Sequence, residues 1–183
     1  MSTDTPDLHR RSIRLQEYDY AQAGGYFVTI CTHGHKCMFG EVRNSDIVLN
    51  SIGQLVDEEW RRTSVVRAEV LLDAFVIMPN HLHGIVFINE HQKDGAGNVP
   101  PRIMRGTGHR SLSSFVSGFK AATTRHANAI RGVSATALWQ RNYYEHVIRD
   151  ERDLERIRQY IADNPVRWHE DGYHPSKTHG AGA

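Results

Sequence analysis

Apolar and polar positions along the chain predict a sheet of short strands interleaved with three helices. Runs rich in β-branched and aromatic residues, bounded by Gly, Asn or Pro, are typical of strands. Such runs lie at 26–32, 37–42, 47–49, 70–78 and 81–88, with a partly extended stretch over 137–148. Apolar residues at helical spacing predict helices over 51–63, 111–130 and 150–164. Antiparallel strands with helices gathered on one face form an α+β fold, which we expect here.

Length and composition fit one ordinary globular domain. The 183 residues are 39% hydrophobic and 23% charged. No apolar run approaches the roughly 20 residues of a membrane span, and the first residues do not form a signal peptide. Cys31 and Cys37 are expected to be reduced thiols of a cytoplasmic protein. We expect a flexible basic arm over 1–22, a single domain over 23–170 and a flexible tail over 171–183.

Two histidines, His81 and His83, stand two residues apart at the start of an apolar run. Successive side chains of a strand point to opposite faces, so both imidazoles lie on one face and Leu82 packs on the other. Neutral imidazole is a common metal ligand, and with oxygen donors and a substrate phosphate present magnesium or manganese is plausible. The pair alone is weak evidence, because two histidines can simply cap a strand.

The last predicted helix carries Tyr160 and Asn164, four residues apart and therefore on the same face. A tyrosine at the edge of an apolar stripe is often only a packing residue, and an Asn before a proline often only ends a helix. As a nucleophile, a tyrosine needs help because its ordinary pKa is about 10. A nearby cation would stabilise the phenolate and polarise a phosphate.

Positive charge is concentrated in one segment, although the net charge is only +1. Residues 102–131 contain six Lys and Arg and no acidic residue. This pattern is typical of contact with a phosphate backbone, and a solvated helix face produces it too. The candidate DNA-binding residues are five from this segment and one beyond it: Arg102, Arg105, Arg110, Lys120, Arg125 and Arg141.

Three further groups of residues offer weaker alternatives. Segment 31–37 holds two cysteines and two histidines, but an extended strand would spread them over ~20 Å, which disfavours a zinc site. Tyr143 and Tyr144 could supply a rival nucleophile or stack on bases. Glu145 and His146 could act as a general acid or base, although their spacing does not require it.

Three segments occur in order with unrelated spacers: YFVTICTHGHKCMFGEV at 26–42, DAFVIMPNHLHGIVF at 73–87 and LWQRNYYEHVIRDERDLERIRQYIADNPVRW at 138–168. Together they resemble the single-tyrosine HUH transposases, in the branch of the REP-associated tyrosine transposases. The second segment holds the His-hydrophobic-His motif of that family. The resemblance covers much of the chain over 26–168 and implies a ferredoxin-like antiparallel sheet with helices packed mainly on one face.

The resemblance also implies a site and a reaction. His81 and His83 would bind a divalent metal, Mg²⁺ or Mn²⁺, and Asn164 would be the third protein ligand, where related transposases often have the longer Gln. Tyr160 would attack a phosphate of single-stranded DNA beside an imperfect hairpin, leaving a 5′-phosphotyrosine and a free 3′-OH. The enzyme would act on short palindromic repeats, as a monomer or homodimer, in the bacterial cytoplasm near the nucleoid.

Two other functions would use some of the same residues. The first is a hairpin DNA-binding protein derived from a transposase that has lost catalysis, and the joint presence of the four site residues argues against it. The second is a histidine-triad nucleotide hydrolase, which needs another histidine two residues after His83. Ile85 stands at that position, so this function is disfavoured.

Overall fold

The computed structural model describes residues 24–89 and 111–178, so the expected arm over 1–22 and the segment 90–110 lie outside the described residues. Four strands form one antiparallel sheet in the spatial order β4-β5-β1-β6. These strands are β1 (Gly24–Cys31), β4 (Val70–Met78), β5 (His81–Ile88) and β6 (Tyr144–Ile148). The expected antiparallel sheet is confirmed.

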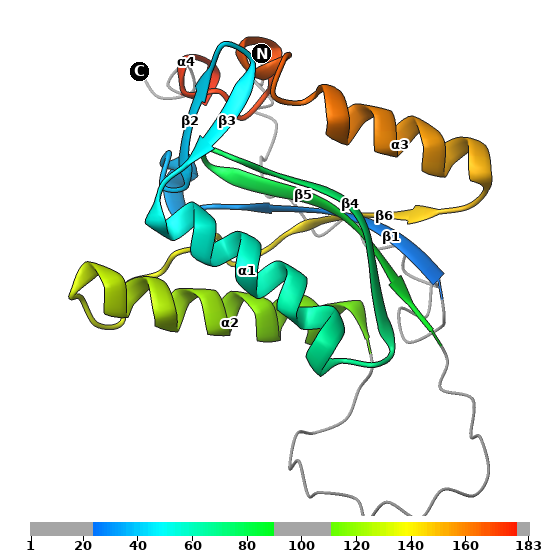
Figure 1. The fold of residues 1–183 in the computed structure, drawn as a ribbon, viewed down its shortest axis with the longest axis horizontal. Coiled ribbons are helices and arrows are strands. Elements are labelled where there is room, and N and C mark those ends of the chain that lie inside the picture. The colour runs from blue at the N-terminus through cyan, green and yellow to red at the C-terminus, as the bar shows by residue number, and fades with distance from the viewer. Residues whose placement is uncertain (1–23, 90–110, 179–183) are drawn as a thin grey trace, which may run out of the picture.

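Three long helices cover the two faces of this sheet. Helices α1 (Ser51–Val66) and α2 (Leu112–Arg131) lie together on one face, and α3 (Glu151–Asp163) lies on the other (Figure 1). Along the chain, the sheet strands and the first two helices follow the β-α-β-β-α-β order of ferredoxin-like folds. The α+β class with helices mainly on one face is thus confirmed, and α3 is the helix that takes the opposite face.

Short elements complete the described part of the chain. A separate hairpin follows β1, one short helical turn precedes this hairpin, and two more short helical elements lie near the C-terminus. These elements are η1 (His33–His35), β2 (Gly40–Arg43), β3 (Asp46–Leu49), η2 (Trp168–Glu170) and α4 (Pro175–Thr178).

Each long helix begins at a side-chain cap. Asn50, Ser111 and Asp150 each accept a hydrogen bond from a backbone N–H in the first turn that would otherwise lack a partner. Helix α1 ends three residues later than the pattern predicts. Val65 and Val66 in its last turn are 82% and 65% exposed. The last turn therefore has no buried apolar face, and the sequence pattern does not reveal it as helical.

Side chains of β1 alternate between two apolar cores, one on each face of the sheet. Tyr26 and Val28 pack with α1 and α2, whereas Phe27 packs with α3. Gly84 on β5 faces α1, and a Cβ at this position would lie 2.4 Å from the indole ring of Trp60. A glycine is therefore required where the Trp60 ring lies against the strand. The histidines of β5 consequently face the α3 side.

Residues 171–178, the described part of the predicted tail, contact the turn between β4 and β5. The carbonyl of Tyr173 accepts a hydrogen bond of 2.7 Å from the Asn80 side chain. The ring centre of Tyr173 lies 4.9 Å from that of His81. These residues are mostly polar and show no periodic pattern. Their place is set by contacts with residues about 90 positions earlier, which a local pattern does not reveal.

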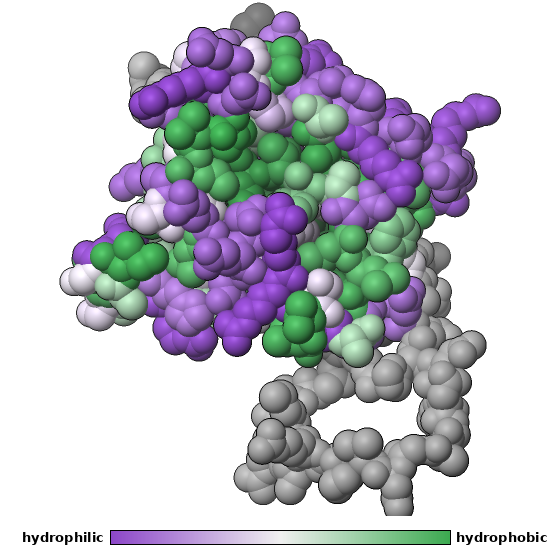
Figure 2. Space-filling view, in the orientation of Figure 1, coloured by the Kyte–Doolittle hydropathy of each residue, from purple (hydrophilic) through white to green (hydrophobic). Residues whose placement is uncertain are grey.

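The exposed surface carries scattered apolar residues. Figure 2 shows several hydrophobic patches separated by hydrophilic residues, and the large exposed apolar side chains belong to different elements. Such scattered residues are normal on a protein surface. Within 24–89 and 111–178, no helix has both the length and the apolar content needed to cross a bilayer.

Candidate active site

Two buried imidazoles form the centre of the site. His81 and His83 lie on the α3 face of β5 with ring centres 4.4 Å apart, and both are almost fully buried. Nδ1 of His81 lies 2.9 Å from Oδ1 of Asn80, and Nδ1 of His83 lies 2.8 Å from Oγ1 of Thr29. Each ring is thus held through Nδ1, and its Nε2 is the atom left for the site.

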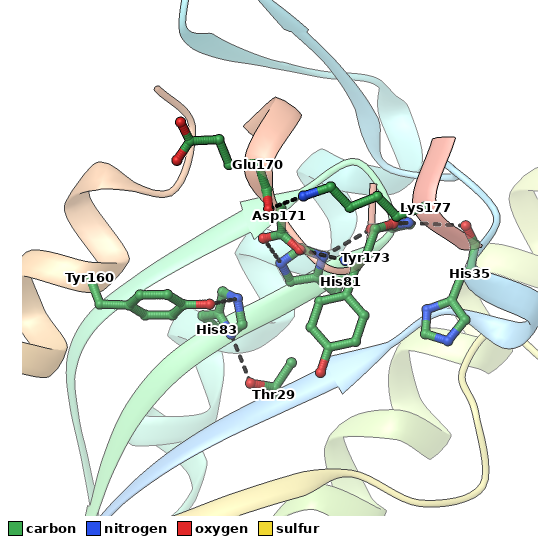
Figure 3. A network of polar contacts seen from close by, with 10 residues as sticks. Thr29, His35, His81, His83, Tyr160, Glu170, Asp171, Tyr173 and Lys177 are labelled. Atoms are coloured by element: carbon green, nitrogen blue, oxygen red, sulfur yellow. Dashed lines mark hydrogen bonds and ion pairs between the residues drawn. The ribbon is translucent and has the colours of Figure 1, made fainter. Parts of the chain in front are cut away.

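Tyr160 reaches the same place from α3. Its hydroxyl lies 3.2 Å from Nε2 of His83, and its ring packs edge-on against Phe27. Figure 3 shows the phenol pointing from α3 toward the imidazole of His83. Ile157 and Ile161 on the same helix are buried between α3 and the sheet, which sets the height of the tyrosine above β5. The tyrosine itself is 43% exposed, so its phenol is accessible from solvent.

Asn164 is the residue that ends α3, and it is buried beside the histidines. Its amide interacts with both His81 and Tyr160. Its Oδ1 has no hydrogen-bond partner among the described residues. The structure therefore brings together the four residues singled out from the sequence for catalysis and metal binding.

Asp171 is a site residue that the sequence interpretation missed. One ligand atom each of His81, His83 and Asp171 lie within 4.8 Å of one another, and Oδ2 of Asp171 is 3.8 Å from Nε2 of His81. The carboxylate lies just after η2 and is only 6% exposed. The only sequence signal was an acidic residue shortly after the helix that carries Tyr160.

Burial sets the protonation of these groups. It lowers the pKa of His83 to about 3 and, with the charges of His83 and His35, lowers the pKa of His81 well below its usual range. Both imidazoles are therefore neutral near pH 7. Burial, followed by the charge of Asp171, raises the pKa of Tyr160, with Asn164 opposing the shift. The phenol is accordingly protonated and a weak nucleophile without a cation.

The residues fit a divalent metal. Nε2 of His81, the carboxylate of Asp171 and Oδ1 of Asn164 are hydrogen-bond acceptors, and the first and last have no partner among the described residues. Buried acceptors without a donor are costly, and a cation would satisfy them. A mixed set of imidazole, carboxylate and amide ligands can hold Mg²⁺, Mn²⁺ or another first-row ion.

A pocket of about 220 Å³ opens beside this cluster. Tyr160, Asn164, Asp171 and Tyr173 are among the residues that line it. The guanidinium of Arg167 is a further lining group and pairs with Glu170 at the surface. The pocket therefore gives solvent and ligands a route to the tyrosine and to the candidate metal ligands.

The structure describes three of the six residues predicted to contact DNA. Arg102, Arg105 and Arg110 are outside the described residues, and Arg125 is exposed on α2, across the sheet from the tyrosine. Arg141 is exposed in the loop before β6.

Lys120, also predicted to contact DNA, bonds to the backbone of a nearby loop. Its Nζ donates to the carbonyl oxygens of Gln140 and Asn142, both at 3.0 Å, and burial lowers its pKa to about 8. The ammonium thus holds the loop that leads into β6.

The weaker alternatives are also placed. Tyr143 lies on the α2 side, 3.4 Å from Ser113, whereas Tyr144 is 45% exposed and packs edge-on against Phe27. His146 pairs with Asp153 at 2.7 Å. Within the described part of the chain, the cysteines and histidines of 31–37 form no metal-binding group of three, and both cysteines are thiols, as expected.

Comparison with known proteins gives relatives over most of the chain. No family model matches. An uncharacterised protein of Haemophilus influenzae is 42% identical over 169 residues, which span 89% of this chain and 92% of that protein. Another protein of the same organism, named "Putative REP-associated tyrosine transposase", is 28% identical over 94 residues, or 51% of this chain and 48% of that one.

Among solved structures, a REP-associated tyrosine transposase bound to a REP hairpin matches with a TM-score of 0.55 and 21% identity. The match covers 82% of this chain and 72% of that one, and it shows that the fold is shared. The chain belongs to one family with the uncharacterised Haemophilus protein. Its resemblance to the REP-associated tyrosine transposases is confirmed by the other two matches.

Proposed function

We propose that this protein is a metal-dependent enzyme that nicks and rejoins single-stranded DNA at hairpin-forming palindromic repeats, with Tyr160 as nucleophile. The observation that carries the proposal is the 3.2 Å separation between the Tyr160 hydroxyl and Nε2 of His83. His83 also belongs to the one group of three metal-ligating side chains found in the described residues. A tyrosine placed against a metal site is what phosphoryl transfer through a phenol requires.

The choice of DNA as substrate rests on the relatives. The solved structure with the same fold is bound to a REP hairpin, and the relative that matches half of this chain carries the name of that transposase group. The pocket beside Tyr160 would admit a phosphate of such DNA. Arg125 and Arg141 remain exposed and available to DNA that reaches those surfaces.

The reaction would proceed by displacement at phosphorus. The phenol of Tyr160 gives up its proton to solvent, and its oxygen forms a bond to the phosphorus while the bond to the 3′ oxygen breaks. The 3′ oxygen takes up a proton from solvent and leaves as a hydroxyl, and the 5′ end stays on the protein. Rejoining reverses these events when a 3′-OH attacks the phosphotyrosine. A bound Mg²⁺ or Mn²⁺ would stabilise the phenolate and polarise the phosphate. Arg167 would add positive charge at the pocket wall.

The metal would be held by both histidines, Asn164 and Asp171. The amide of Asn164 interacts with His81 and Tyr160. This position supports the role of third metal ligand that the family resemblance implies. Asp171 adds a carboxylate to this set. Carboxylate oxygen favours hard divalent ions, which supports Mg²⁺ or Mn²⁺ as the cofactor.

Incubation with 5′-labelled and 3′-labelled hairpin DNA tests the proposal. With Mn²⁺ or Mg²⁺, a protein–DNA adduct that survives denaturing electrophoresis should form, and EDTA should abolish it. Tyr160→Phe should lose the adduct and keep hairpin binding, whereas Tyr144→Phe, which alters another exposed tyrosine on the same side, should keep both. Hairpin binding by the wild type without any adduct would favour the non-catalytic DNA-binding protein instead.

A further inference from the structure

The residue immediately before the first histidine has a fully buried polar side chain. Asn80 occupies the turn between β4 and β5 and has no exposed surface. Its carbonyl accepts a hydrogen bond of 2.8 Å from the backbone N–H of Thr32. Its side chain makes three further bonds to three separate parts of the molecule, which is more than a tight turn requires.

Chemistry fixes the orientation of this amide. One of its terminal atoms lies 3.0 Å from the carbonyl oxygen of His35 and 2.7 Å from that of Tyr173. Carbonyl oxygens only accept, so this atom is the NH₂ group, which donates to both. The other terminal atom is therefore Oδ1, and it faces Nδ1 of His81 at 2.9 Å.

An amide oxygen also only accepts, so Nδ1 of His81 carries the proton. In the neutral imidazole the lone pair then lies on Nε2, the atom 3.8 Å from Asp171 and without a partner among the described residues. We propose that Asn80 is a positioning residue that sets the His81 tautomer for metal binding and at the same time holds the segment carrying Asp171. Without an acceptor at Nδ1, the proton could move to Nε2 and block the ligand atom.

The second part of the proposal concerns the bond to Tyr173. The backbone N–H of Tyr173 donates to Oδ1 of Asp171 at 2.6 Å, and its carbonyl accepts from Asn80. One amide thus bonds to a histidine ligand on one side and, through Tyr173, to the carboxylate on the other. Groups of this kind, which orient ligands, commonly change metal affinity by about 10- to 100-fold when removed.

His83 provides a contrast within the same site. Its Nδ1 partner is the hydroxyl of Thr29, and its Nε2 partner is the hydroxyl of Tyr160. A hydroxyl can donate or accept, so these bonds are compatible with either tautomer of His83. The control of tautomer by a fixed acceptor is therefore a property of the Asn80–His81 pair.

The use of the lone pair rests on the proposed metal-dependent function, but the tautomer can be measured without metal or DNA. We would record ¹H–¹⁵N correlation spectra of the full chain with ¹⁵N-labelled histidine in the presence of EDTA. Wild type should show the His81 proton on Nδ1. Asn80→Ala should move it wholly or partly to Nε2, and Asn80→Asp, which keeps an acceptor, should leave it on Nδ1.

Asn80→Asp also separates the two halves of the proposal. It loses both donated bonds, so amide hydrogen exchange over 171–178 should become faster while the tautomer is unchanged. Asn128→Ala is the matched control, because Asn128 is a buried Asn that donates to a carbonyl, that of Thr136, on the far side of the sheet. This control should alter neither the tautomer nor the exchange.

Metal binding is the final measurement. The affinity for Mn²⁺, followed by electron paramagnetic resonance, should fall by about 10- to 100-fold in Asn80→Ala and stay within twofold of wild type in Asn128→Ala. An Asn80→Ala protein with the His81 proton still wholly on Nδ1, or with wild-type Mn²⁺ affinity, would overturn the proposal.

If Asn80→Ala does not fold, amide hydrogen exchange in Asn80→Asp tests the proposal instead. Unchanged exchange over 171–178 in that variant would contradict the proposal, and faster exchange would support it. The proposed function and this inference can fail independently. A wild type that forms no DNA adduct contradicts the proposed function alone, whereas an unaltered tautomer in Asn80→Ala contradicts this inference alone.

Discussion

The hydroxyl of Tyr160 lies 3.2 Å from Nε2 of His83, although 77 positions separate the two residues in the chain. Two features of α3 hold this contact. Its apolar side packs on Phe27 and Ile85 of the sheet, and Arg158 pairs with Asp73 of β4 through two bonds of 3.0 and 2.8 Å. The position of the tyrosine is therefore set by the docking of a whole helix.

Breaking the anchor of α3 should reduce cleavage more than DNA binding. Asp73→Asn leaves the Arg158 guanidinium without its bidentate partner, and a small displacement of a reacting group can cost up to about 100-fold in rate. Adduct formation with hairpin DNA, measured as a time course, should slow by about tenfold or more. Arg156→Gln removes an exposed pair on the same helix and should leave the rate unchanged. Equal rates in both variants would show that this anchor does not position Tyr160.

Loss of the carboxylate should weaken metal binding. Asp171→Asn removes a charged oxygen from the group formed with His81 and His83, so the affinity for Mn²⁺ should fall by at least about tenfold in a calorimetric titration. Asp163→Asn is the matched change, since Asp163 lines the same pocket but bonds to Gln159. An equal loss in both variants would indicate a general effect of charge instead of direct ligation.

The metal-free protein should lose stability as the pH falls below about 6.5. Burial holds the pKa of folded His83 at about 3, against 6.5 in the unfolded chain. Between these values the unfolded state binds more protons, so the free energy of unfolding decreases by roughly 1 to 1.5 kcal/mol per pH unit for this group. His81, whose pKa burial also lowers, adds to the slope.

Urea unfolding in EDTA between pH 7 and 4 measures this slope. His83→Gln removes one of the two titrating groups and should make the slope shallower. A wild-type stability that is flat over this range would mean that the histidines are protonated in the folded state or already exposed. Protonation of Asp73, which would break its pair with Arg158, lowers stability only at a lower pH. The reason is that the bond from Arg158 lowers the pKa of Asp73 from 3.8.

Two glycine substitutions should have opposite effects on stability. Gly84→Ala places a Cβ 2.4 Å from the Trp60 ring and should lower the free energy of unfolding by about 1 to 3 kcal/mol. Gly118→Ala, on an exposed part of α2 with open space around it, should raise that free energy by about 0.5 to 1 kcal/mol. Urea denaturation of both variants checks this, and a neutral Gly84→Ala would contradict the close packing of Trp60 on β5.

Local pattern was enough for most of the secondary structure. The strands β4 and β5, the turn at Asn80 and the cap at Asp150 follow from residues within a few positions of each other. The pairing of His81 with His83 on one face follows from strand periodicity, and that of Tyr160 with Asn164 follows from helix periodicity. Each of these relationships is local, and local geometry repeats with a known period.

The tertiary structure decided how these local pieces meet. It placed α3 on the face opposite to α1 and α2, brought Asp171 to His81 across 90 positions and used Lys120 to hold a loop. Such contacts depend on packing and burial between distant segments, which no local period encodes. The sequence by itself thus determined which side chains could do the chemistry, and the fold decided which of them share one buried site.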